Sequence, residues 1–577
     1  MIRRTEQGEQ KDQGERKQRP ERPERPERPD EGEQEPGGVG EPPLSILFAS
    51  AEAWPLAKTG GLGDVAFGLT QALAAAGHDI RLLLPAYPSA VEALPKITAR
   101  HRGNVDDRPV TLLEGVLPGT EGDTPVRTYL LDDPALFARV GTPYGTLAGE
   151  TWPDNDRRFY WLSRVAAALA AGELLQWRAA VLHANDWQTA LAPLFLRDHR
   201  QRPGTLFSIH NLAYRGLFGR EIEQRLALPR DLWGPHGLEF YGQWAFIKGG
   251  LVLSDAITTV SPSYAAEIQT PAFGWGLDGL LRERAPVLHG IVNGIDTATW
   301  NPATDPHLAV RYDAPDAAAK AANRQAVANE LGIDLGAGAS RTTSPLLGFI
   351  GRLVEQKGVD LLLAALPRLL ATGARLALLG SGDPALERAL REAAAAHPGR
   401  IGLYLGYDEG LAHRIEAGAD LFLMPSRFEP CGLNQLYSLR YGTPPVVNPT
   451  GGLADTVVDV VGWGPALEPG ATFGAPLGSA AGAAAGTAPG TTGSTNPGGG
   501  ELHPHGERAA GGAGDFGTGF HMASADAAGL AEAVERALTF WRHEPTWQAI
   551  QARGMAGDYS WSRSAAAYVA LYRQVAA

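Results

Sequence analysis

Short apolar runs alternate with amphipathic runs along most of the chain. The first half contains six runs that are almost continuously apolar, at 44–50, 79–85, 125–131, 179–185, 205–211 and 256–262. Longer stretches at 64–77 and 157–175 have the apolar spacing of helices. Continuous apolar runs are typical of strands that are buried on both faces of a parallel sheet, and helices between them indicate a doubly wound α/β fold.

The same alternation begins again after the segment VNGID at 292–296. Five apolar runs follow, at 345–351, 374–380, 400–406, 419–425 and 443–449, with a helical stretch at 358–371. The pattern therefore predicts two Rossmann-like domains, which we expect to span 44–290 and 291–553. Because ligands of such folds bind outside the carboxyl ends of the strands, we expect the active site in the cleft between the domains.

Two segments have a composition that does not favour a packed core. Residues 1–43 are nearly all polar, proline or glycine and include the tandem ERPERPERP, which predicts a disordered tail. Residues 466–515 are rich in glycine, alanine, serine and threonine, which predicts a flexible insertion in the second domain.

Composition and charge narrow the classes of partner. The chain has 577 residues, of which 44% are hydrophobic, and a net charge of -13, so we expect neither nucleic acid nor an anionic membrane as its main partner. It has one cysteine, no apolar run long enough to span a bilayer and no apolar region of a secretory signal. We therefore expect a cytoplasmic protein, and its oligomeric state is left open.

Polar clusters follow the predicted strands of the first domain. KTGGLGD at 58–64 places Lys58 and three glycines between a strand and a helix, where backbone amides suit an anion, although a tight turn explains the glycines equally well. HANDW and HNLAY place His183, Asp186 and His210 at the ends of two further strands. A histidine in such a place is usually structural, but parallel strand ends would bring all three to one surface.

The second domain repeats this arrangement with basic residues. GRLVEQKG places Arg352 and Lys357 after its first strand, where two cations suit a diphosphate, although an exposed loop also explains them. PSRFEPCGL places Glu429 before a helix, where it either caps the helix or accepts hydrogen bonds from sugar hydroxyls. TGGLAD at 450–455 offers further amides to an anion. We interpret Cys431 as a small packing residue, because no histidine is adjacent to it in sequence.

A short acidic pattern, DND at 154–156, matches the D-x-D pattern of metal-dependent sugar-nucleotide enzymes. It precedes a predicted helix, where an N-cap explains it. We therefore expect no metal site there.

Taken together, the motifs resemble those of bacterial glycogen synthases and plant starch synthases, which extend α-1,4-glucan with ADP-glucose. The matching segments lie in the family's order between about 44 and 460: KTGGLGDV, HANDW, SIHNLAYRG, HGLEFYGQ, TVSPSYAAEI, VNGID, GRLVEQKG, LLGSGD, PSRFEPCGLNQLYSLRYGT and TGGLADTV. The resemblance implies the GT-B architecture, in which the first domain holds the glucan and the second holds the sugar nucleotide. It also implies a C-terminal helix within 554–577 that packs back on the first domain.

The resemblance assigns roles to individual residues. It implies Asp186, His210 and Glu429 as catalytic residues. The residues that it implies for the sugar nucleotide are Lys58, Gly60, Gly61, Arg352, Lys357, Glu429, Cys431, Gly432, Thr450 and Gly451, and those near the acceptor are Tyr144 and Asn155. The expected partners are ADP-glucose and α-1,4-glucan such as glycogen, with no cofactor and no metal.

Three functions remain open from the sequence. The first is retaining glucosyl transfer from ADP-glucose by front-face displacement, in which the leaving diphosphate helps to take the proton of the glucan 4-hydroxyl. The second is a related transferase that uses UDP-glucose or a small acceptor, and the third is a catalytically silent glucan-binding protein, against which the intact site residues argue. One residue departs from the family pattern, because Asn185 stands where the family commonly has the second histidine of HAHDW.

Overall fold

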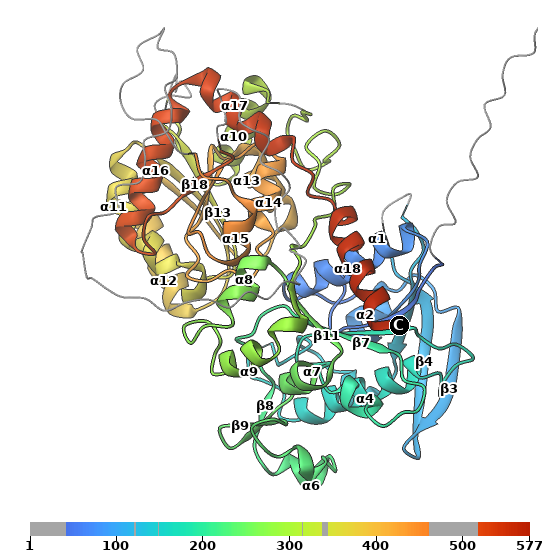
Figure 1. Ribbon diagram of the computed structural model, residues 1–577. Coiled ribbons are helices and arrows are strands. Elements are labelled where there is room, and N and C mark those ends of the chain that lie inside the picture. Colours follow the sequence, from blue (N-terminus) through green and yellow to red (C-terminus); the bar gives the residue numbers. More distant parts are fainter. Residues whose placement is uncertain are drawn as a thin grey trace, which may run out of the picture. The chain divides into compact units, whose positions relative to one another are not determined.

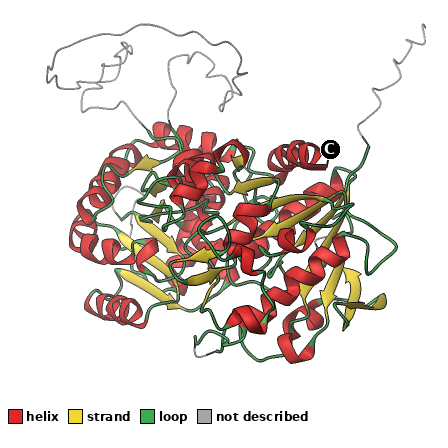
Figure 2. Cartoon of the chain, turned by 60° about the horizontal axis from the view of Figure 1, so that its bottom comes forward, coloured by secondary structure: helices red, strands yellow, loops and turns green. Residues whose placement is uncertain are grey.

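The computed structural model describes residues 42–119, 123–147, 149–313, 315–336, 344–460 and 517–576. The residues from Pro43 to Ala577 belong to one compact unit. Within it, two sheets are packed between helices (Figures 1 and 2). The predicted insertion at 466–515 and almost all of the predicted tail lie outside the described residues.

The first sheet contains nine of the described strands, in the order β12-β11-β7-β6-β1-β2-β5-β4-β3. Their bounds are β1 Ser45–Ala49, β2 Asp79–Pro85, β3 Ala99–Val105, β4 Arg108–Val116, β5 Arg127–Leu131, β6 Val181–Asn185, β7 Gly204–Ile209, β11 Ala256–Thr259 and β12 Leu288–Gly290. Neighbouring strands from β12 to β5 are parallel, whereas β4 is antiparallel to both of its neighbours. The six strands predicted for the first domain are all present.

The hairpin β3–β4 at the edge of this sheet was not predicted. Side chains along β3 alternate between partly buried and exposed, because this strand ends the sheet. Its residues therefore do not form the continuous apolar run by which the inner strands were recognised. A small separate sheet of β8 Leu217–Phe218, β9 Glu239–Phe240 and β10 Gln243–Ala245 was also not predicted.

The second sheet is parallel throughout, with the order β15-β14-β13-β16-β17-β18 among the described strands. Its strands are β13 Leu346–Ile350, β14 Arg375–Gly380, β15 Ile401–Leu405, β16 Leu421–Met424, β17 Pro445–Val447 and β18 Phe520–His521. The five predicted strands are present, and the two-residue β18 is additional. The two-domain Rossmann-like architecture that the pattern predicted is thus confirmed.

Helices cover both sheets. Those of eight residues or more are α1 Gly61–Ala75, α4 Asn155–Ala170, α10 Ala317–Glu330, α11 Val359–Ala371, α12 Pro384–Ala396, α13 Glu409–Gly418, α16 Ala527–Trp541, α17 Glu544–Met555 and α18 Trp561–Ala576. The shorter ones are α2 Pro88–Ala93, α3 Pro134–Phe137, α5 Ala192–Leu196, α6 Ile222–Arg225, η1 Arg230–Leu232, α7 Ile247–Leu253, α8 Pro262–Glu267, α9 Asp278–Glu283, η2 Ala285–Val287, η3 Glu355–Lys357, α14 Asn434–Arg440 and α15 Gly451–Thr456. Among the described residues, no helix is both long and apolar enough to cross a membrane.

The last helix, α18, lies against α1 and the first sheet (Figure 1). The Tyr572 hydroxyl is 2.8 Å from Nδ1 of His183 in β6. At the other end of α18, the Trp561 indole lies over Gly68 of α1, where an added Cβ would be 1.9 Å from the indole nitrogen. The chain thus returns from the helices of the second domain to the first domain. The predicted domain boundaries themselves stay predictions.

The close approach of Trp561 to Gly68 predicts a stability effect. Gly68→Ala places a methyl group inside the indole, so we expect it to lower the free energy of unfolding by about 1–3 kcal/mol. Gly279→Ala is the matched control, because the nearest heavy atom to its added Cβ is 3.9 Å away. Both variants are measured by urea denaturation.

A double variant separates this clash from a general loss of helix packing. Trp561→Ala removes the indole, so adding Gly68→Ala to it is expected to cost much less than in the parent. An unchanged unfolding midpoint for Gly68→Ala alone would show that the glycine does not serve this contact.

Candidate functional site

A buried carboxylate holds the glycine-rich loop that follows β1. Glu52 accepts hydrogen bonds from the Thr59 N–H at 2.6 Å, the Gly60 N–H at 3.2 Å and the Thr59 hydroxyl at 2.6 Å. The Tyr144 hydroxyl also donates to it. The Gly60 amide, which was expected to face an anion, therefore has a carboxylate partner. Helix α1 begins at the next residue, Gly61.

Lys58 lies at the start of the same loop and is paired with a carboxylate of α1. Its ammonium nitrogen is 2.7 Å from Oδ1 of Asp64. Burial raises the pKa of Asp64, and the Lys58 charge partly opposes that shift. The loop also lies beside the second domain, because a Cβ added to Gly61 would be 3.9 Å from Cδ1 of Leu433.

Asp186 and His210, at the ends of β6 and β7, lie together as predicted from the parallel strands. The His210 N–H donates to Oδ1 of Asp186 at 2.8 Å. Burial raises the pKa of Asp186 to about 7, although the amides of His210 and Asn211 oppose the shift. Burial lowers the pKa of His210 to about 4, so its imidazole is neutral at pH 7.

The other two polar residues of HANDW have different partners. His183 lies 2.6 Å from the Ser208 hydroxyl and contacts Tyr572 of α18, so it is a satisfied structural residue and does not join the cluster. Asn185 does join it, because its Oδ1 lies 2.9 Å from Nε2 of His210. The position that departs from the family pattern therefore contacts a predicted catalytic residue.

Arg352 and Lys357 lie just after β13 and reach different partners. Arg352 donates to the Tyr214 hydroxyl at 3.2 Å, which joins the second domain to the HNLAY segment of the first. The Lys357 ammonium forms an ion pair with Glu429. Glu429 is buried and also accepts a hydrogen bond from Ser426 at 3.0 Å. One predicted phosphate ligand, Lys357, is thus paired with the predicted sugar ligand Glu429, whereas Arg352 of the same loop contacts the first domain.

The TGGLAD segment is held by a carboxylate that the sequence analysis did not single out. Glu267, at the end of α8 in the first domain, accepts hydrogen bonds from the Gly451 N–H at 2.7 Å and the Thr450 hydroxyl at 3.0 Å. Gly451 has φ +46°, and an added Cβ would lie 2.1 Å from the Glu429 carbonyl oxygen. Only glycine fits this close approach of two backbone segments.

Cys431 and Gly432 lie between Glu429 and α14. Burial raises the pKa of the Cys431 thiol to about 12, so it is not a thiolate at neutral pH. The cysteine packs among residues of the first domain such as Phe207 and Ile209. This agrees with its interpretation as a packing residue. Gly432 has φ +74°, which glycine adopts without strain.

The two residues predicted near the acceptor are in direct contact. Asn155, at the start of α4, donates to the Tyr144 carbonyl at 2.9 Å and accepts from Arg158 at 2.6 Å. Tyr144 in turn reaches Glu52 through its hydroxyl. The acceptor side is therefore linked through Glu52 to the loop that carries Lys58.

The aspartates of DND are paired with arginines. Asp154 forms a bidentate pair with Arg139, with both distances 2.6 Å, and Asp156 pairs with Arg225. The Asp154 side chain makes no capping hydrogen bond, so the N-cap interpretation was wrong. Within the described ranges, no three His, Cys, Asp or Glu side chains are grouped so that they could hold a metal ion.

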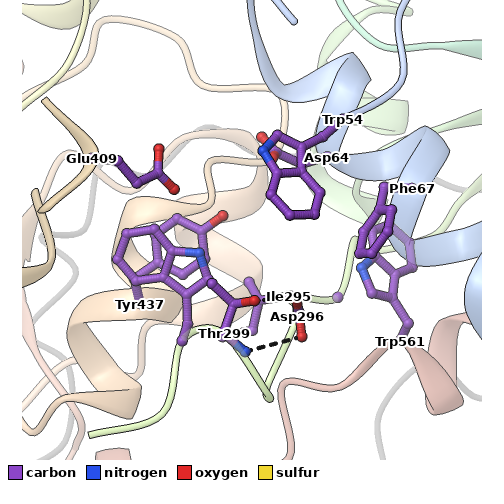
Figure 3. A pocket seen from close by; sticks show the side chains of 11 residues that line it. Trp54, Asp64, Phe67, Ile295, Asp296, Thr299, Glu409, Tyr437 and Trp561 are labelled. Atoms are coloured by element: carbon purple, nitrogen blue, oxygen red, sulfur yellow. Dashed lines mark hydrogen bonds between the residues drawn. The ribbon is translucent and has the colours of Figure 1, made fainter. Parts of the chain in front are cut away.

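A small cavity of about 30 Å³ lies among side chains of both domains (Figure 3). Trp54, Asp64, Glu409, Tyr437 and Trp561 are among its lining residues. A sugar nucleotide needs a site of several hundred Å³, and none of the residues predicted to bind it lines this cavity. The candidate site is therefore the cluster at the strand ends.

The sequence analysis missed Glu52, Glu267 and Tyr214. Glu52 is the acidic residue nearest to the end of the first strand, which is a signal that could have identified it. Tyr214 belongs to the HNLAY motif but was not singled out. Glu267 lies in the matching segment TVSPSYAAEI, but its role could not be predicted, because its partners are 183 or more positions away in the sequence.

Comparisons with known proteins identify the family of this chain. Residues 45–283 match the family model described as "Starch synthase catalytic domain", and residues 344–471 match the family model described as "Glycosyl transferases group 1". A protein named glycogen synthase from Halorhodospira halophila is 61% identical over 534 residues, which cover 92% of this chain and 99% of that protein. Another so named, from Alkalilimnicola ehrlichii, is 61% identical over 531 residues, which cover 92% of this chain and 98% of that protein.

Solved structures show the same architecture. The catalytic domain of starch synthase IV from Arabidopsis thaliana, bound to ADP and acarbose, has a TM-score of 0.74 and 30% identity, and the match covers 93% of this chain and 100% of that chain. A sucrose-phosphate synthase from Thermosynechococcus elongatus has a TM-score of 0.52 at 16% identity over 92% of this chain and 99% of that chain, which shows the fold alone. The resemblance seen in the sequence is confirmed, and the chain belongs to the glycogen and starch synthase family of glycosyltransferases.

Proposed function

We propose that this chain is a glycogen synthase. It transfers glucose from ADP-glucose to the 4-hydroxyl at the non-reducing end of an α-1,4-glucan, retains the α configuration and releases ADP. The relatives named glycogen synthase and the similar starch synthase bound to ADP and acarbose support this proposal. The observation that carries it is the ion pair of Lys357 with Glu429 on the second domain, together with the hydrogen bond from Arg352 of the same loop to Tyr214 of the first domain.

The donor diphosphate is proposed to bind Arg352 and Lys357. A guanidinium and an ammonium on one short loop suit two adjacent phosphates, because charge-assisted hydrogen bonds to phosphate are strong. When Lys357 turns to the diphosphate, the carboxylate of Glu429 is released to accept hydrogen bonds from the glucose hydroxyls. Lys58 is proposed to change partner in the same way, from Asp64 to the diphosphate.

The proposed reaction is a front-face displacement. The bond from the anomeric carbon to the diphosphate breaks, the bond to the glucan 4-oxygen forms on the same face, and the hydroxyl proton passes to the departing phosphate. Negative charge grows on the diphosphate as this bond breaks, and Arg352 and Lys357 stabilise it. Asp186 is proposed to support the positive charge that develops on the sugar. No cofactor and no metal form part of this proposal, and the cytoplasmic location stays a prediction.

The choice of donor tests the proposed function directly. Purified protein is incubated with glycogen and either radiolabelled ADP-glucose or radiolabelled UDP-glucose, with and without EDTA. We expect label from ADP-glucose to enter the polymer, at the same rate with the chelator. Preferential incorporation from UDP-glucose would favour the related transferase, and no incorporation from either donor would favour a silent glucan-binding protein.

Removing either phosphate ligand should lower turnover. We expect Arg352→Ala and Lys357→Ala each to lower kcat by about 10²–10³-fold, because their charge is needed most when the diphosphate departs. The KM for glycogen should change by no more than about threefold. Arg368→Ala is the control, since Arg368 pairs with Glu535 on the helices of the second domain. Near-normal turnover in both site variants would contradict the assignment.

The raised pKa of Asp186 predicts a pH dependence of the rate. If the ionised carboxylate supports the sugar, kcat/KM should rise about tenfold per pH unit up to about pH 7 and then level off. Asp186→Asn should be slow and lack this rise.

The stability of the same two proteins provides an independent check. Because the folded pKa of Asp186 is raised from 3.8, the folded state holds this proton longer than the unfolded state does. The parent should therefore lose stability relative to Asp186→Asn as the pH rises from about 4 to about 7. A rate profile that is identical in parent and variant would rule out this role of Asp186.

A further inference from the structure

The amide of Asn185 can be oriented without ambiguity. Asn185 is the last residue of β6 and is fully buried. Its Nδ2 donates to the Ala49 carbonyl at 3.1 Å and lies 3.4 Å from the His183 carbonyl. Two carbonyl oxygens require a donor between them, so the amide nitrogen occupies this side and Oδ1 occupies the other.

This orientation determines where His210 carries its proton. Oδ1 of Asn185 lies 2.9 Å from Nε2 of His210, and an amide oxygen only accepts hydrogen bonds. Nε2 must therefore carry the proton and donate it to Oδ1. Burial lowers the pKa of His210 to about 4, so the ring is neutral at pH 7 and has one proton. Nδ1 is consequently left with a lone pair.

That lone pair has no partner among the described residues. Nδ1 of His210 is buried and makes no hydrogen bond there. The backbone N–H of the same residue donates to Asp186, whose pKa burial raises to about 7. A buried acceptor without a donor costs stability, and such groups in native proteins often serve a ligand. A hydroxyl group would supply the missing donor.

We propose that Asn185 is a positioning residue that holds His210 as the Nε2–H tautomer, so that Nδ1 accepts a hydrogen bond from a hydroxyl of the transferred glucose. The identity of the sugar rests on the proposed function, whereas the tautomer rests on the structure alone. The position that departs from the family pattern thus has a defined task. A histidine there can donate or accept through either ring nitrogen, so it does not by itself impose this tautomer.

The first experiment reads the tautomer directly. The full chain is labelled with ¹⁵N-histidine, and the ring signals of His210 are assigned by their loss in His210→Gln. In the parent at pH 7 we expect Nε2 to have the shift of a protonated nitrogen and Nδ1 that of an unprotonated one. Asn185→Leu keeps the approximate shape of the side chain but removes the acceptor, so both tautomers should be populated.

Asn323→Leu is the matched control for the loss of a buried asparagine. Asn323 is also buried and also binds backbone through both ends of its amide, to the N–H and carbonyl of Val310. It lies on α10, outside the candidate site. This variant should keep the His210 signals of the parent even if it is less stable. A protonated Nδ1 in the parent, or unchanged His210 signals in Asn185→Leu, would overturn the proposal.

The second experiment asks whether Nδ1 binds a sugar hydroxyl. Transfer to glycogen is measured with ADP-glucose and with its 2-, 3-, 4- and 6-deoxy analogues. In the parent, loss of the hydroxyl that donates to Nδ1 should lower kcat/KM by about tenfold. In Asn185→Leu, the same analogue should lower kcat/KM by only about twofold relative to ADP-glucose. The factors by which the other analogues lower kcat/KM should be the same as in the parent.

The two experiments separate the failure of this inference from that of the proposed function. If the parent does not use ADP-glucose, the proposed function and the sugar contact fail together, and the tautomer is still decided by the ¹⁵N signals. A different outcome is an active parent in which each deoxy analogue lowers kcat/KM by the same factor as it does in Asn185→Leu. In that case the sugar contact is wrong and the proposed function stands. A role of Asn185 in folding alone would lower all rates equally and leave the pattern of penalties unchanged.

Discussion

The candidate site depends on buried and half-buried carboxylates that accept hydrogen bonds from backbone N–H groups. Glu52 holds the loop after β1, Asp186 holds the start of the loop after β7, and Glu267 of the first domain holds the TGGLAD loop of the second. A buried carboxylate without such donors is costly, so each of these loops can move only if its carboxylate finds other donors. The carboxylates therefore position the loops of the site; Asp186 and Glu267 lie in segments that match the family, whereas Glu52 does not.

The same constraint explains the charge of the site. Lys58 and Lys357 each pair with a carboxylate, Asp64 and Glu429 respectively. In the proposed function, a diphosphate competes with these carboxylates for the lysines, and its binding is coupled to the release of both. Under the same proposal, Glu429 then becomes free to accept hydrogen bonds from the glucose of the donor.

Much of the fold could be predicted from the sequence, because inner parallel strands are continuous apolar runs. The hairpin β3–β4 could not, since the edge strand β3 has the mostly polar sequence ARHRGNV and contains no continuous apolar run. The motifs at strand ends likewise indicated which site residues lie close together. In the structure, Asp186 contacts His210 and Lys357 contacts Glu429. The partner of Gly451 could not be predicted, because no local pattern reveals contacts between distant segments. For the same reason, the Asn185 departure could be noticed in the sequence but not explained.

The most direct test of this account is a crystal structure of the full chain with ADP. The account predicts that oxygens of the diphosphate lie about 2.7–3.2 Å from the Arg352 guanidinium and the Lys357 ammonium, and that Lys357 has left Glu429. A diphosphate bound elsewhere, with the Lys357–Glu429 ion pair intact, would contradict it.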